Sequence, residues 1–262
     1  MKLNLILIII FSIFLLGCGK ESSNNTNQKG YIPTEYNNPN PSQITILAIG
    51  QSNMSNSGTG LDYTSKYGTI RIDSNYNYVV AKSPNSLNVL ASGTGSNFLP
   101  LLGDMLIENG IYGNVTYANL AVNGSCMIEW TPAQTTFNFQ KIERVSRQGF
   151  EFTHILFHQG ECDTEQFFNT SKEDYKKYFL QMLQGIRDLG INAPIYVART
   201  SYVFGITDDR IIQAQNELIQ QYPDILEGPY TDIMGSEYRH DDVHFNRDGL
   251  INHALMWSQL IH

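Results

Sequence analysis

Two hydrophobic patterns alternate along the chain from residue 44 onward. Residues 44–49 (ITILAI) form an unbroken apolar run that ends at Gly50, which is typical of a strand buried on both faces. Residues 97–109 have apolar side chains at helical spacing and are followed by Gly110, which predicts a helix. The same patterns predict strands over residues 115–122, 153–157 and 193–198, and helices over residues 139–148, 171–189, 208–221 and 247–261.

This alternation of strands and helices predicts an α/β fold in which helices cover both faces of a parallel sheet. Two helix starts carry capping signals, namely Ser171 with Asp174, and Asn246. Residues 58–95 break the pattern with many Asn, Ser and Tyr residues, and we interpret them as an insertion near a functional site. Ligands bind at the carboxyl ends of strands in such sheets, so the polar residues after each strand are the candidates for the functional site.

The N-terminus differs from this pattern. Lys2 precedes an apolar run that is too short for a comfortable membrane span and is typical of a secretory signal. The run ends in Leu-Leu-Gly-Cys and resembles a bacterial lipobox, in which the signal is removed and the cysteine is lipidated. We predict a lipoprotein signal over residues 1–18 with lipid on Cys18; a plain signal peptide or short anchor helix is the alternative. Gly19, rather than aspartate, favours the periplasmic face or outer membrane of a bacterial cell envelope.

Residues 19–43 are rich in Asn, Ser and Pro and contain few apolar side chains. Such a segment cannot bury a core, so we predict a flexible polar tether. Its root-mean-square reach as a coil is about 25–30 Å, enough to hold a folded domain away from a lipid surface. The folded domain is therefore predicted over residues 44–262.

Composition narrows the class of protein. Hydrophobic residues make up 42% and charged residues 16%, which is ordinary for a globular domain. The formal charge is −8, with 17 basic and 25 acidic residues, so a nucleic-acid partner is not expected. The 3 cysteines include no CxxC pair, which argues against a disulfide scaffold or a zinc or thioredoxin-type site. The composition carries no indication of the oligomeric state.

Four polar segments follow predicted strands or precede the last helix. They are GQSNM at residues 50–54, NGSCMIEW at 123–130, HQGECD at 158–163 and DDVH at 241–244. A serine on a strand-to-helix turn is well placed as a nucleophile, which suits Ser52. His244 can act as its base, and Asp241, three residues earlier, can hold the histidine tautomer.

An oxyanion formed in such a reaction needs donors. The backbone N–H groups of Ser52 and Gly124 and the side-chain amide of Gln159 are the candidates for this oxyanion hole. Ser52 alone has a simpler interpretation, because a serine after a strand is more often a turn or N-cap residue. The accompanying DxxH and HQGE segments favour the catalytic interpretation.

The four segments in this order resemble the blocks of the SGNH hydrolase superfamily. Within it they are most similar to the sialate O-acetylesterase-like domain, which includes the carbohydrate esterase family 6 acetylesterases. GQSNM together with HQGE is a discriminating pair, and the resemblance covers most of residues 44–261.

The resemblance implies a flavodoxin-like three-layer α/β/α sandwich with a central parallel sheet, the SGNH hydrolase fold. It implies removal of acetyl groups from sugars by a serine mechanism, with no metal and no cofactor. Ser52 becomes the nucleophile, His244 the base and Asp241 its partner, while Ser52, Gly124 and Gln159 form the oxyanion hole. Two positions depart from the family pattern: Asn123 replaces a glycine, which bears on substrate preference, and Cys162 replaces a small residue that is often serine.

Several residues leave alternatives open. His240 and His244 with their neighbouring aspartates resemble a metal site, and so do His154, His158, Glu161 and Asp163. His154 lies in an apolar strand, which favours a core histidine, and no third ligand set has recognised spacing. Glu161 is either a structural acceptor or a second active-site acid. Cys126 and Cys162 lie close to the two loop donors, so they are either a disulfide of an exported domain or two buried thiols, the interpretation slightly preferred. Trp130 is either a sugar-stacking or, more commonly, a buried ring.

We therefore expect a carbohydrate O-acetylesterase, a metal-independent carboxylic ester hydrolase that forms an acyl-serine intermediate. Its partners would be an acetylated carbohydrate, either sialic acid or a polysaccharide, and the membrane through the lipid on Cys18. The alternatives are a sugar-binding surface lipoprotein without activity, an O-acyltransferase using the same triad and a metal-dependent phosphoesterase. Intact Ser52, His244 and Asp241 weigh against the inactive binding protein.

Overall fold

The computed structural model describes residue 31 and residues 42–85, 87–133 and 137–261. Cys18 and most of the predicted tether lie outside the described residues. Tyr31 is an exception, because its ring packs edge-on against Tyr222 with 5.3 Å between centroids and its hydroxyl donates to Asp224. This residue of the predicted tether therefore contacts the domain. Across the described ranges, helices are all too short or too polar to span a bilayer.

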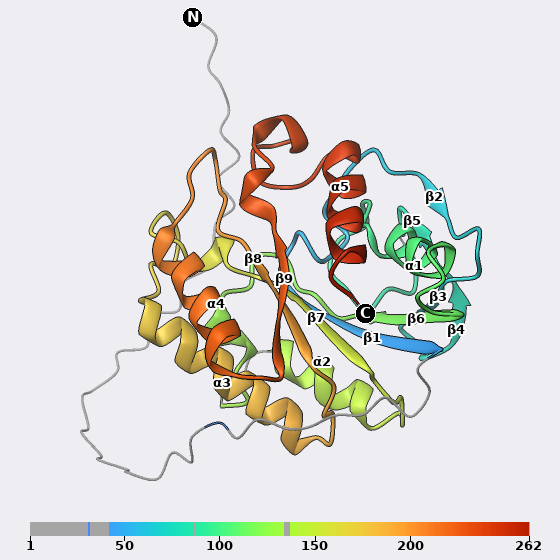
Figure 1. Cartoon of the computed structure of the whole chain (residues 1–262), viewed down its shortest axis with the longest axis horizontal. Coiled ribbons are helices and arrows are strands. Elements are labelled where there is room, and N and C mark those ends of the chain that lie inside the picture. Colours follow the sequence, from blue (N-terminus) through green and yellow to red (C-terminus); the bar gives the residue numbers. More distant parts are fainter. Residues whose placement is uncertain (1–30, 32–41, 86, 134–136, 262) are drawn as a thin grey trace, which may run out of the picture. The chain divides into compact units, whose positions relative to one another are not determined.

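A seven-stranded sheet forms the centre of the domain, in the order β4-β3-β6-β1-β7-β8-β9 (Figure 1). Neighbouring strands are parallel except for β3 and β4, which are antiparallel. The strands span Gln43–Gly50 (β1), Ile70–Ile72 (β3), Tyr78–Val80 (β4), Asn114–Asn119 (β6), His154–His158 (β7), Ile195–Arg199 (β8) and Ile225–Tyr230 (β9). The predicted α/β fold with a central parallel sheet is confirmed, with one antiparallel strand at its edge.

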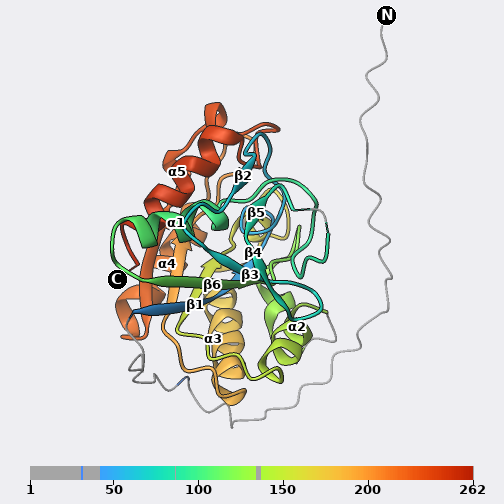
Figure 2. The ribbon, with the colours of Figure 1, turned by 90° about the vertical axis from the view of Figure 1, so that its right-hand side faces the viewer.

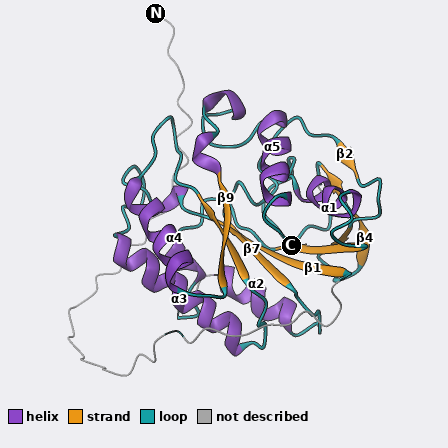
Figure 3. Ribbon diagram, in the orientation of Figure 1, coloured by secondary structure: helices purple, strands orange, loops and turns teal. Residues whose placement is uncertain are grey.

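Helices cover both faces of this sheet, and Figures 2 and 3 show the resulting layers. α1 and α5 lie on one face, and α2, α3 and α4 lie on the other. Their bounds are Leu99–Glu108 (α1), Phe137–Ser146 (α2), Lys172–Asp188 (α3), Asp209–Gln221 (α4) and Arg247–Ser258 (α5). Both predicted caps are present: Ser171 Oγ accepts from the Asp174 N–H at 3.1 Å, and Asn246 Oδ1 accepts from the Gly249 N–H at 3.0 Å.

Strand β1 shows why the two layers form. Its side chains point alternately to opposite faces, as in any strand. Ile46 and Ala48 belong to the apolar cluster that includes α1 and α5, whereas Leu47 and Ile49 belong to the cluster on the side of α2, α3 and α4. All four are buried, so the unbroken apolar run in the sequence reflects burial on both faces.

Several short strands were not predicted from the sequence. β3 and β4 lie in the insertion of residues 58–95, which also holds the antiparallel pair β2 (Tyr63–Thr64) and β5 (Lys82–Ser83). β9 was missed because its sequence ILEGPY contains a glycine and a proline. Gly228 is required there, since a Cβ atom at this position would lie 2.6 Å from the Val197 carbonyl carbon in β8.

The topology places a switch point at the end of β1. The chain passes from β1 to β6 on one side of it and later to β7 on the other side. Loops that leave the two sides of such a switch point diverge, and this is where open α/β sheets bind ligands. The segments that follow β1, β6 and β7 are three of the four polar segments singled out in the sequence.

Candidate active site

Ser52 lies on a tight turn directly after β1. The preceding Gly50 has φ of +129°, and a Cβ atom there would lie 2.1 Å from the His158 carbonyl oxygen, so no other residue fits without a shift. The Gln51 N–H donates to that same carbonyl at 2.9 Å, and the Met54 N–H donates to the Gln51 carbonyl at 3.0 Å. The turn therefore holds Ser52 at the carboxyl end of the sheet, as predicted.

His244 and Asp241 form a hydrogen-bonded pair on the loop before α5. The distance from His244 Nδ1 to Asp241 Oδ2 is 2.7 Å, and Asp241 Oδ1 accepts from the backbone N–H groups of His244 at 2.7 Å and Val243 at 3.0 Å. Burial alone raises the pKa of Asp241, but these hydrogen bonds and the His244 ring lower it below its usual value. An ionised Asp241 accepts the Nδ1 proton and leaves Nε2 of His244 as the free ring nitrogen.

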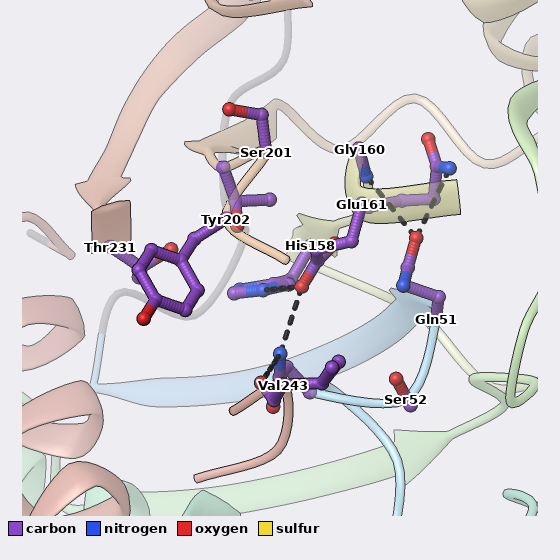
Figure 4. Close-up of polar contacts among 12 residues, drawn as sticks. Gln51, Ser52, His158, Gly160, Glu161, Ser201, Tyr202, Thr231 and Val243 are labelled. Carbon is purple, nitrogen blue, oxygen red and sulfur yellow. Dashed lines mark hydrogen bonds and ion pairs between the residues drawn. The ribbon is translucent and has the colours of Figure 1, made fainter. Parts of the chain in front are cut away.

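Asn53 connects the serine turn to the histidine loop. Its Nδ2 donates to the Val243 carbonyl at 3.1 Å, and the Phe245 N–H donates to its Oδ1 at 3.3 Å. Val243 and Phe245 flank His244, so one side chain holds the loop on both sides of the histidine. Figure 4 shows Ser52 and Val243 on the neighbouring backbone segments. In the described part of the chain no hydrogen bond joins the Ser52 hydroxyl to the His244 ring.

Glu161 is buried behind this connection and does not contact His244. Its Oε1 accepts from Asn53 Nδ2 at 2.8 Å and lies 3.2 Å from His158 Nε2 (Figure 4). Burial raises the pKa of Glu161, but the His158 ring and the hydrogen bonds outweigh it and lower the pKa to about 2. Of the two alternatives for Glu161, the geometry favours an ionised acceptor that orients Asn53.

The buried hydrogen-bond chain continues into α5. His158 Nδ1 lies 3.2 Å from His253 Nε2, which also accepts from the Trp257 indole N–H at 2.9 Å. Burial lowers the pKa of His253 well below its usual value, so this ring is neutral. The last helix thus contacts the site through side chains that the sequence patterns did not single out.

The expected oxyanion donors are only partly available. Gly124 has φ of +68°, and among the described residues no acceptor faces its backbone N–H or that of Ser52. Gln159 is different and requires a correction. Its amide nitrogen donates to Asp163 Oδ2 at 2.5 Å and lies 3.2 Å from the Ser125 carbonyl oxygen, so both of its N–H groups are used within the protein.

Gln51 is a residue whose role the sequence did not indicate. Its Oε1 accepts from the backbone N–H groups of Cys162 at 3.1 Å and Gly160 at 3.3 Å, and Gln159 Nε2 also lies 3.3 Å away (Figure 4). Gln51 therefore joins the serine turn to the turn after β7. Its place in GQSNM was the available signal, but only the tertiary structure shows its partners.

A disulfide joins Cys126 to Cys162, with 4.9 Å between their Cα atoms. The slightly preferred interpretation of two free thiols is therefore wrong, and the alternative of a disulfide holds. The bond links the loop of Gly124 to the turn after β7, both of which border Ser52. Trp130, in the segment that follows Gly124, is buried, and its indole N–H donates to Ser125 Oγ at 3.0 Å. The ring therefore packs beneath the Gly124 loop and does not stack on a sugar.

Three side chains on the histidine loop have the composition of a metal site. Ligand atoms of His240, Asp241 and His244 all lie within 4.8 Å of one another. The 2.7 Å separation of His244 Nδ1 and Asp241 Oδ2, however, is that of a direct hydrogen bond, which already uses one nitrogen and one oxygen of the set. His240 also lies 3.3 Å from the Ser57 carbonyl oxygen through its Nε2.

The three-layer α/β fold is that of SGNH-type esterases. The chain belongs to the carbohydrate esterase family described as sialic acid-specific acetylesterase, whose model matches residues 41–261. This membership makes the protein a hydrolase for acetylated carbohydrate. No curated protein matches the chain in sequence.

Solved structures support the fold at low sequence identity. A protein from Arabidopsis thaliana is similar with a TM-score of 0.64 and 17% identity, over 84% of this chain and 97% of that chain. A carbohydrate esterase family 3 protein from Talaromyces cellulolyticus has a TM-score of 0.55 and 12% identity, over 82% and 95%. A variant of a Geobacillus acetyl-xylooligosaccharide esterase has a TM-score of 0.51 and 12% identity, over 83% and 93%.

Proposed function

We propose that the protein is a serine esterase that removes O-acetyl groups from a carbohydrate through an acyl-serine intermediate. The observation that supports this most directly is the His244–Asp241 pair, held beside the Ser52 turn by Asn53. A histidine with Nδ1 bound to a carboxylate and Nε2 free is the arrangement that activates a serine hydroxyl.

The first half of the reaction transfers the acetyl group to the enzyme. Ser52 Oγ attacks the acetyl carbonyl carbon while His244 Nε2 takes the hydroxyl proton. The negative charge that develops on the carbonyl oxygen is stabilised by the backbone N–H groups of Ser52 and Gly124. The carbon–oxygen bond to the sugar then breaks, and the sugar oxygen receives the proton from His244. Gln159 takes no direct part in this scheme, because its amide N–H groups bind Asp163 and Ser125.

The second half restores the enzyme. A water molecule gives its proton to His244 and attacks the acetyl-serine, and acetate leaves as Ser52 regains its proton. Asp241 keeps the imidazole in the required tautomer and stabilises its protonated form throughout. Glu161 acts at a distance, by orienting Asn53 and so the two segments that Asn53 connects.

Covalent labelling of the purified full chain tests this mechanism. An organophosphonate ester should stop hydrolysis of p-nitrophenyl acetate and add its mass to the peptide that contains Ser52. Ser55→Ala is the control, because it removes a neighbouring hydroxyl on the same turn. This variant should be inhibited and labelled as wild type is. Label elsewhere, or activity that disappears with a chelator and returns with zinc, would contradict the serine mechanism and favour the metal interpretation of His240, Asp241 and His244.

We also propose that the enzyme is held at the bacterial cell envelope by lipid on Cys18. The support is the Leu-Leu-Gly-Cys sequence at the end of an apolar segment. A polar stretch separates it from the domain, which would then act on carbohydrate outside the cytoplasm.

A further inference from the structure

Four solvent-exposed apolar side chains lie on two turns beside the candidate site, at residues 165–168 and 203–206. The exposed fractions are 55% for Phe167, 57% for Phe168, 58% for Phe204 and 49% for Ile206. The rings of Phe167 and Phe204 have centroids 6.3 Å apart, so the two turns form one surface, which we call the aromatic rim. Isolated exposed apolar side chains are ordinary, but a contiguous group marks a surface that binds something.

Both turns are attached to the segments that build the site. The Phe204 N–H donates at 3.0 Å to the carbonyl of Asp242, which is next to Asp241 on the histidine loop. The Phe168 N–H donates at 3.1 Å to the carbonyl of Cys162, which directly follows Glu161. The aromatic rim therefore borders the candidate site from two directions.

Folding alone does not explain the backbone conformation of the turn that carries Phe204 and Ile206. Residues 203–206 form a tight turn in which Val203 and Ile206 exchange two backbone hydrogen bonds of 2.9 Å. Phe204 has φ of +50° and Gly205 has φ of +80°, a conformation that suits Asn-Gly and is strained for a bulky residue. With more than half of its surface exposed, Phe204 gains little burial in return. The ring of Phe204 is therefore left open for contact with a ligand.

We propose that the aromatic rim binds a pyranose ring of a neutral, O-acetylated polysaccharide whose acetyl group reaches Ser52. The inference rests on the proposed function and specifies its substrate class. Phenylalanine rings offer broad apolar faces without hydrogen-bonding groups, which match the CH face of a pyranose. Asp241 and Asp242 are exposed beside the rim on a chain of net charge −8, which opposes a sugar that carries its own carboxylate.

Comparison of three esters tests the proposal with the purified full chain. The substrates are p-nitrophenyl acetate, acetylated xylo-oligosaccharide and O-acetylated sialic acid. Phe167→Ala and Phe204→Ala should each lower kcat/KM for the xylo-oligosaccharide about tenfold or more, with a far smaller change for p-nitrophenyl acetate. Phe204→Trp should retain most of the activity. Phe137→Ala, which removes a ring of 60% exposure at the start of α2, is the matched control and should match wild type on all substrates.

Other results would overturn the proposal. These are equal losses on all three esters, no loss on the oligosaccharide, or a loss confined to the sialic acid ester. A change of sedimentation coefficient in Phe204→Ala would instead identify the rim as a contact between copies of the chain. Binding of deacetylated xylo-oligosaccharide to Ser52→Ala gives an independent reading. If wild type hydrolyses none of the esters, the proposed function fails, yet loss of that binding in Ser52→Ala/Phe204→Ala would still report on the rim.

Discussion

Asp241 uses both carboxylate oxygens on its own loop, one for the His244 ring and one for two backbone N–H groups. The carboxylate therefore positions the ring and the loop together. Ser52→Ala and His244→Ala should lower kcat/KM for p-nitrophenyl acetate about 10⁴-fold or more, and Asp241→Asn about 100-fold or more, because the amide no longer holds the working tautomer.

Glu161→Gln should lose less activity than Asp241→Asn, because Glu161 contacts Asn53 and His158 rather than His244. Steady-state kinetics on variants with wild-type circular dichroism spectra checks this order. If Asp241→Asn retains near-normal activity while Glu161→Gln loses it, Glu161 is the triad acid and our assignment is reversed.

The buried Glu161 also predicts how stability depends on pH. Its pKa is about 2 in the folded protein and 4.5 when unperturbed, so the unfolded chain binds the proton first as the pH falls. The stabilisation of the fold by ionised Glu161 is complete above about pH 5 and is lost toward pH 2. Burial also lowers the pKa of His253, so its ring is protonated more readily in the unfolded chain. This group therefore also lowers stability as the pH falls below the usual pKa of histidine.

Urea unfolding at pH 7, 5 and 3 measures this dependence. The free energy of unfolding of wild type should fall more steeply with acid than that of Glu161→Gln, which has no carboxylate to titrate at this position. Glu151→Gln removes an exposed carboxylate and serves as the control, with the slope of wild type. Parallel slopes for all three proteins would show that Glu161 is not ionised in the fold.

At the scale of elements, the end of β1 depends on close contact with β7. Gly50→Ala would place a methyl group 2.1 Å from the His158 carbonyl oxygen, so the strands must separate. We expect a loss of about 3 kcal/mol or more in the free energy of unfolding, together with reduced activity because the Ser52 turn moves. Gly149→Ala is the matched control, since Gly149 also has positive φ but has open space around it. This variant should lower the free energy of unfolding by about 1 kcal/mol. Equal losses for the two variants would exclude the close contact as the cause.

The predictability of each element followed its burial. β1 and the five helices were identified because one or both faces are apolar over several turns or a full strand. β3, β4 and β9 were not, because they are short or contain residues that disfavour strands, and their place is fixed by neighbours such as β8. The same holds in the site: Asp241 reaches His244 within one loop and was predicted, whereas the partners of Gln51 and Asn53 come from distant segments and were not.

At the scale of the whole molecule, the Cys126–Cys162 disulfide closes a loop across two site segments. The double variant Cys126→Ser/Cys162→Ser should lose about 2–4 kcal/mol of stability and part of its activity, because the Gly124 loop is less restrained. Mass spectrometry after alkylation without reductant checks the bond, and two labelled cysteines would exclude it. Reductant should lower the thermal midpoint of wild type and leave that of the double variant unaltered.

The location of the molecule is tested by Cys18→Ala. We expect wild type in the membrane fraction with a lipid mass on its mature N-terminus, and the variant released or incorrectly processed. Wild type and variant in the same fraction, with no lipid mass on either, would end this proposal. Esterase activity should survive in the variant, since the domain does not depend on this residue.

The bond between Asn53 and Val243 joins residues 190 positions apart in the chain. The ribosome therefore makes the nucleophile turn well before the base and the helix behind it. A ribosome-bound or truncated chain that ends before residue 240 carries Ser52 without a partner and leaves Glu161 without His253 behind it. Hydrolysis therefore requires synthesis of the chain through α5, and recovery of activity during refolding reports the docking of this helix.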